Sequence, residues 1–241
     1  MKNIKTLLAA LALTCTIYSP TQAATLDGMP DSEIKRTHVG YFYTISTEVP
    51  FDIEYQLKRA ADLIDNDADY KLALAIIEEI TNTNDQVVEA WVLGAICNEK
   101  MGQFRDAEKY WKSALMIEPD NIAFYYYRGM NYLQSAAGYN YEYENAIGQF
   151  KRALEINPNF IDAKVGIATA YELRGDSKYS GEYDKLNSYE KALDIYNKLL
   201  VTLPDNGVIL EKKRIVQEKL NKIKEAEEER KRKQEIAKRI G

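Results

Sequence analysis

Few residues of this sequence have types and spacing that suit catalysis. The chain holds a single histidine, His38, which lies in a segment without helical periodicity. No cysteine–histidine group has the spacing of metal ligands, and no phosphate-binding loop or nucleophile elbow is present. We therefore predict that His38 is a surface residue, that the chain is not an enzyme, and that it needs no metal and no cofactor.

One acidic run, Asp65-Asn66-Asp67-Ala68-Asp69, is similar to the start of a calcium-binding loop. Tyr70 stands where such a loop needs glycine, and Ile76 stands where it needs an acidic ligand. Aspartate and asparagine also favour turns, and aspartate is a good helix N-cap. The run therefore predicts a turn, with Asp69 capping the helix that follows.

The first residues are typical of a secretory signal peptide. Lys2 and Lys5 precede an apolar run over 7–13, and small residues favour cleavage after Ala23. The apolar run is too short to span a bilayer. We expect residues 1–23 to be removed and the mature chain to be periplasmic or secreted, without a transmembrane segment.

The two cysteines, Cys15 and Cys97, bear on anchoring and redox chemistry. Lipidation of Cys15 is the less favoured alternative to cleavage, because Thr14 replaces the small residue expected before a lipidated cysteine. Cleavage would leave Cys97 alone, without an internal disulfide. It would also remove two lysines and no acidic residue, which lowers the net charge from −5 to −7. This charge argues against nucleic acid as a partner.

A repeat near 34 residues organises the middle of the chain. Within residues 88–121, aromatic, small and proline residues follow in a fixed order: Trp91, Ala95, Gly102, Ala107, Trp111, Ala114, Leu115 and Pro119. Trp91 maps to Tyr125 at a shift of 34, Ala107 to Ala146 at 39, and Ala146 to Ala192 at 46. Other positions of the same helices keep the same shifts. Insertions of five and twelve residues therefore lie inside the third and fourth units.

This order of residues resembles the tetratricopeptide repeat. The resemblance implies an all-α fold, a right-handed solenoid of four helical hairpins at 54–87, 88–121, 122–160 and 161–206. Small residues such as Ala95 with Ala107, and Gly129 with Ala146, should let paired helices approach closely. Residues 24–53 do not fit the repeat and form an irregular segment. Residues 207–241 should form a capping helix, with Leu210, Ile215, Val216, Leu220 and Ile223 on the hairpin and a charged, solvated end.

In this family the first helix of each repeat forms a concave wall. The matching positions are Tyr55, Lys58, Asp62, Glu89, Val92, Ile96, Glu99, Tyr126, Met130, Leu133, Val165, Thr169 and Glu172. The lysine, asparagine and arginine set with which relatives grip a peptide carboxylate is missing. An apolar or amphipathic peptide is therefore the expected ligand. The alternative is that the chain's own N-terminal segment or an insertion covers this wall.

Tyrosines concentrate in the two insertions, which should lie side by side. A second contact edge is predicted at Tyr139, Tyr141, Tyr143, Tyr179 and Tyr183, unless these rings only pack on one another. The leading hypothesis is a protein-binding adaptor of the bacterial envelope. The alternatives are a glycan or envelope-polymer binder that uses the insertion tyrosines, and a chaperone-like holder of exported chains.

Overall fold

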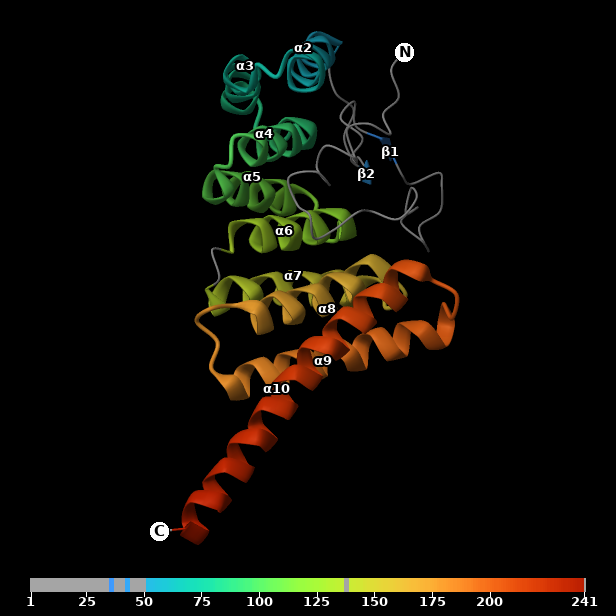
Figure 1. Cartoon of the computed structure of the whole chain (residues 1–241). Helices are drawn as coiled ribbons and strands as arrows, with labels where there is room; N and C mark the ends of the chain where they lie inside the picture. The colour runs from blue at the N-terminus through green and yellow to red at the C-terminus, as the bar shows by residue number, and fades with distance from the viewer. Residues whose placement is uncertain (1–34, 37–41, 44–50, 137–138, 241) are drawn as a thin grey trace.

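Eight helices form four hairpins that stack in sequence order (Figure 1). The computed structural model describes residues 35–36, 42–43, 51–136 and 139–240. The predicted signal peptide, Cys15 and His38 lie outside these residues. The helix pairs are α2 (Phe51–Asp62) with α3 (Tyr70–Thr83), α4 (Val88–Lys100) with α5 (Phe104–Ile117), α6 (Ile122–Ser135) with α7 (Asn140–Ile156), and α8 (Ile161–Asp176) with α9 (Glu182–Thr202).

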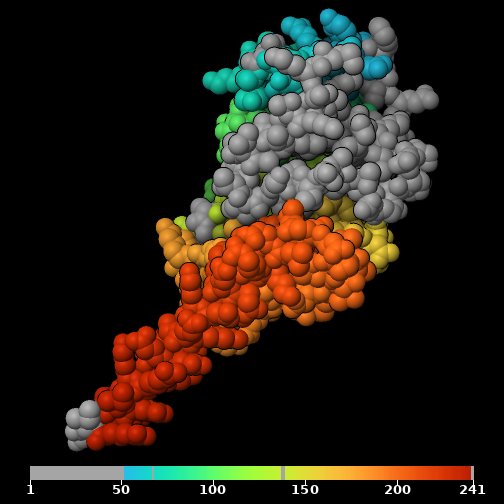
Figure 2. Space-filling view, turned by 45° about the vertical axis from the view of Figure 1, so that its right-hand side comes forward, coloured from blue at the N-terminus to red at the C-terminus, as the bar shows by residue number. Residues whose placement is uncertain are grey.

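A last long helix, α10 (Gly207–Ile240), packs against α9 and then extends away from the array. Figure 2 shows its end as a narrow rod. A short antiparallel pair, β1 (Lys35–Arg36) and β2 (Phe42–Tyr43), lies to one side of the helices, with β2 next to α6. The predicted all-α solenoid is confirmed. No helix over 51–136 and 139–240 is both long and apolar enough to cross a membrane.

The helices approach closely where glycine meets an aromatic ring. A Cβ atom on Gly129 of α6 would lie 2.7 Å from Phe150, and one on Gly166 of α8 would also lie 2.7 Å from Phe150. The fully buried Phe150 ring of α7 is therefore wedged between two glycines of neighbouring hairpins. Ala146 is also fully buried. The predicted small-residue contact thus serves chiefly to admit an aromatic ring.

The insertions lengthen helices instead of forming long loops. α7 has 17 residues, α8 has 16 and α9 has 21, against 13 in α4 and 14 in α5. Only residues 136–139 and 177–181 remain between the helices of the third and fourth hairpins. The sequence predicted the position of each insertion, but the helical extension of α7 and α9 changes which tyrosines face solvent.

α10 caps the last hairpin with a partly different set of residues from those predicted. Ile209, Val216 and Leu220 are buried in a core that they share with α8 and α9. Leu210 is exposed, whereas its neighbour Ile209 is buried. The Asn206 side chain accepts a hydrogen bond from the Ile209 N–H and so caps the start of α10. The charged end forms the predicted i,i+4 ion pairs, for example Lys231 Nζ with Glu227 Oε1 at 2.7 Å.

The acidic run over 65–69 forms a turn, as predicted. Leu63–Asp67 is a single π-helical turn, named η1, and Ala68 has the left-handed φ of 52°. Asp69 then caps α3, with its carboxylate accepting a hydrogen bond from the Leu72 N–H at 3.1 Å. No group of three potential metal ligands occurs among the residues that the structure describes.

Asp65 should make stability depend on pH. Burial raises the pKa of its carboxyl to about 6, although nearby Lys100 opposes the shift. A raised pKa means that the folded state holds this proton more tightly, so the stabilisation is lost as pH rises from about 4 through 6. We expect Asp65→Asn to gain stability relative to the parent by about 1 kcal/mol over this window, after allowance for solvent screening.

Urea unfolding at a series of pH values measures this difference. Asp120→Asn is the charge-matched control, because Asp120 is exposed. A difference between Asp65→Asn and the parent that stays constant from pH 4 to pH 7 would show that Asp65 is ionised normally in the folded state.

Candidate binding surfaces

The predicted concave wall is only partly open. In the first hairpin, Tyr55, Lys58 and Asp62 of α2 are exposed. In the second hairpin, Val92 and Ile96 of α4 are buried in the main core, so their prediction as contact residues is corrected. Nine residues of α4 are buried, so this helix is covered on several sides and has no free apolar stripe.

Two acidic residues flank those buried positions on α4. Glu89 and Glu99 are both half-buried. Glu99 accepts a hydrogen bond from the indole N–H of Trp111 at 2.8 Å, across the hairpin. Trp111 is itself fully buried. Glu99 therefore has a structural role in orienting this ring.

The third hairpin keeps a half-buried apolar stretch on α6: Tyr126, Met130 and Leu133. The Tyr126 ring packs against Phe150 and Phe160, with ring centroids 5.8 and 5.4 Å away. β2 of the N-terminal segment also lies next to α6. Tyr126 is thus largely part of the packing between hairpins.

The fourth part of the wall is covered by the protein's own α10. Val165, Thr169 and Glu172 of α8 are buried, so the prediction that they contact a partner is corrected. The Glu172 carboxylate pairs with Lys219 Nζ at 3.1 Å and lies 3.9 Å from Lys212 Nζ, both from α10. The capping helix therefore occupies the place that a ligand would take at this end.

The insertion tyrosines form a cluster at the side-by-side loops, as predicted. The rings of Tyr139 and Tyr179 are parallel, 4.9 Å apart with an interplanar angle of 8°. Tyr141 stacks on Tyr139 at 5.9 Å. These three side chains, here called the tyrosine platform, are 46%, 49% and 55% exposed for Tyr139, Tyr179 and Tyr141.

A neighbouring cation adds to the contacts of the platform. The proximity of the two hydroxyl groups raises the pKa of Tyr139 and lowers the pKa of Tyr179. The Lys178 ammonium lies 4.9 Å from the centre of the Tyr179 ring, a cation–π distance. The platform is therefore a preordered aromatic surface with hydroxyl groups and a positive charge at its side.

The other two predicted edge tyrosines behave differently. Tyr143 is buried, which corrects its prediction as a contact residue. The reason is that residues 140–144 are helical, and residues two apart on a helix point about 200° away from each other. Tyr141 therefore faces solvent while Tyr143 faces the core. Tyr183, at the start of α9, is largely exposed.

Cys97 offers no reactive thiol. It is fully buried in α4, and its Sγ lies 3.3 Å from the carbonyl oxygen of Tyr70. Burial raises the pKa of the thiol to about 12. A thiol that stays protonated and enclosed is a small core residue and not a nucleophile.

Solved structures of stacked helical hairpins resemble this chain. A tetratricopeptide repeat protein from Parabacteroides merdae matches with a TM-score of 0.56 and 18% identity, over 69% of this chain and 58% of that one. A structure of MamA from MSR-1 matches with a TM-score of 0.51 and 18% identity, over 80% of this chain and 100% of that one. At this level of identity, the likeness establishes the fold alone.

Two curated relatives are also similar in sequence. The DnaJ homolog subfamily C member 3 homolog of Dictyostelium discoideum is 26% identical over 59% of this chain and 29% of its own length. Tetratricopeptide repeat protein 6 of Homo sapiens is 26% identical over 54% of this chain and 23% of its own. This chain thus spans less than a third of either relative. No family model matches.

These observations define the class of protein first: a solenoid of stacked antiparallel helical hairpins. The 34-residue register of the sequence resembles the tetratricopeptide repeat, and the chain shares the fold of solved tetratricopeptide repeat proteins.

Proposed function

We propose that this chain is a non-enzymatic scaffold of the bacterial envelope, and that it binds a partner protein through the tyrosine platform. The observation that carries the proposal is the exposed stack of Tyr139, Tyr141 and Tyr179. The fold supports a protein-binding role in general, and the signal-like residues 1–23 support the location.

The physical argument for the platform is its preorganisation. Tyrosine provides contact area with a polar tip at low cost in side-chain entropy. Rings that are already stacked lose little further freedom on binding, so more of the contact energy becomes affinity. Most of the predicted concave residues, in contrast, are buried or covered by α10. The platform therefore replaces the concave face as the leading contact surface.

The same geometry bears on the glycan alternative. A sugar binds an aromatic residue by lying on an open ring face. In the platform, Tyr139 and Tyr179 cover one face of each other. This stacking reduces the open ring face that a sugar could lie on, while the three side chains remain about half exposed for contact with a protein surface.

Affinity capture from the native envelope fraction tests the proposal. We expect Tyr139→Ala with Tyr179→Ala to weaken binding of the purified captured partner by about thirtyfold, the effect of losing a hot spot. The matched control is Met130→Ala with Leu133→Ala on α6, which should bind as the parent does. If only the α6 variant loses binding, the partner binds the concave face and not the tyrosine platform. Binding of envelope polysaccharide by the parent but not by the platform variant would favour the glycan function.

A further inference from the structure

A cleft of about 340 Å³ lies between the start of α9 and the middle of α10. It is separate from the concave wall and from the tyrosine platform. Three basic residues and a single acidic residue line it. The lining residues are Ser180, Glu182, Lys185, Lys222, Ile223, Ala226 and Arg230.

The charges in this cleft are not balanced. Arg230 of α10 reaches back to Glu182 of α9, with Nη2 and Oε1 2.6 Å apart. Among the described residues, no carboxylate lies within ion-pair distance of Lys185 or Lys222. Two positive charges, one from each helix, therefore remain available in a chain whose net charge is −5.

Backbone and apolar groups add to the same cleft. α9 begins at Glu182 after Gly181, which has no side chain to cap the N–H groups of the first turn, although Glu182 and Asp184 place carboxylates in that turn. The N-terminus of a 21-residue helix also carries partial positive charge. Ile223 and Ala226 supply an apolar wall beside these groups. The cleft is therefore suited to an anionic group on an otherwise aliphatic segment.

The cleft and the tyrosine platform share one loop. Residues 177–181 carry Tyr179, which belongs to the platform, and Ser180, which lines the cleft. The Ser180 hydroxyl is fixed by the Arg174 carbonyl at 2.6 Å, so the loop holds the two features in a set relation. A single extended segment passing over this loop would contact both.

We propose that this cleft binds carboxylate side chains from an acidic, aliphatic segment of the partner that contacts the platform. The proposal rests on the proposed function, since it assumes a protein partner. Lys185 and Lys222 supply the charge for recognition, and Glu182 disfavours binding by competing for Arg230. Because the chain has a net negative charge, a positive cleft would favour one position for an acidic segment of the partner.

A synthetic peptide of Glu-Glu-Leu repeats, amidated at its C-terminus and labelled with rhodamine, is the probe. Fluorescence anisotropy measures its Kd at low and at high salt. We expect Lys185→Gln with Lys222→Gln to weaken binding by about tenfold or more, because two charge-assisted contacts are lost. Glu182→Gln should act in the opposite direction and tighten binding, since it removes the competing carboxylate.

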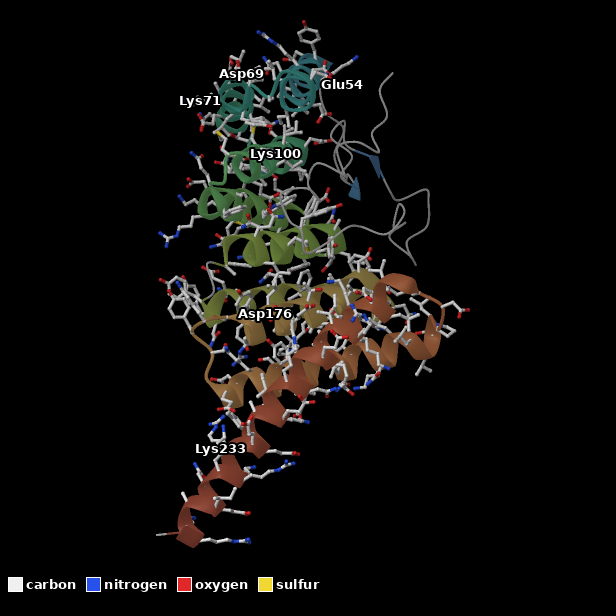
Figure 3. All side chains as sticks on the ribbon, in the orientation of Figure 1. Glu54, Asp69, Lys71, Lys100, Asp176 and Lys233 are labelled. Atoms are coloured by element: carbon white, nitrogen blue, oxygen red, sulfur yellow. The ribbon has the colours of Figure 1, made fainter. Side chains whose placement is uncertain are left out.

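Two controls make the result specific. Lys71→Gln with Lys151→Gln removes the same charge at exposed positions away from the cleft, and Figure 3 shows Lys71 at the opposite end of the array. The same peptide with glutamine in place of glutamate should not bind. The proposal that the cleft binds acidic segments would be wrong if the parent does not bind the peptide. It would also be wrong if both double lysine variants weaken peptide binding equally. If that happens while platform variants still lose the captured partner, the proposed function stands without this cleft.

Discussion

Replacing Phe150 with alanine should lower the free energy of unfolding by about 3–5 kcal/mol. The ring is fully buried and joins the third hairpin to the fourth. Because Gly129 and Gly166 contribute no side chains, they cannot fill the cavity that the ring leaves. Urea unfolding followed by circular dichroism measures the loss.

Two glycine substitutions test whether the Phe150 ring packs directly against Gly166. Gly166→Ala should destabilise the fold by about 1–3 kcal/mol, because the new methyl group would overlap the Phe150 ring. Gly148 of α7 has open space around its Cα, so Gly148→Ala should stabilise by about 0.5–1 kcal/mol through helix propensity. In the Phe150→Ala variant, Gly166→Ala should lower the free energy of unfolding by less than it does in the parent. Equal changes in the free energy of unfolding for Gly166→Ala and Gly148→Ala would contradict the close packing of Phe150 on Gly166.

Replacing Glu172 with glutamine should lower the free energy of unfolding by about 3 kcal/mol, because it removes a buried carboxylate that lies close to two lysines of α10. Glu172 is 8% exposed and lies between Lys212 and Lys219 of α10. Burial already lowers the pKa of Lys212. Lys219 keeps a second partner, Asp176, at 2.7 Å.

Hydrogen exchange locates this effect. In the Glu172→Gln variant, the first half of α10 should lose protection before α4 and α5 do, because the cap is released first. Glu190→Gln, which removes the exposed pair with Lys224, should change stability by only about 0–1 kcal/mol. Unchanged protection of α10 in the Glu172 variant would mean that apolar burial alone holds the cap.

The sequence predicted the fold because stacked helical hairpins need small and aromatic residues at regular spacing. Trp111, Ala107 and Ala146 are fully buried at the positions that the register assigns to the core. Asp69 caps α3, as its place before the helix indicated. These features depend on local spacing, and one chain is enough to show local spacing.

The surfaces were harder to predict because they depend on which elements cover one another. The register assigned Val92, Ile96 and Val165 to an open wall, but all three are buried in the hydrophobic cores. The helical extension of α7 turned Tyr143 inward. Lys185 and Lys222 gave no signal in the sequence, since lysines on helices usually face solvent. Only the crossing of α10 over α9 brings them to one cleft.

Site-specific photocrosslinking tests the central claim most directly. A benzoylphenylalanine residue in place of Tyr179 would report what contacts the platform in living cells, and one in place of Leu133 would report on α6. We predict that the Tyr179 position captures one envelope protein and that the Leu133 position captures none. Crosslinks from Leu133 to a partner, with none from Tyr179, would contradict the platform and restore the concave face as the binding site.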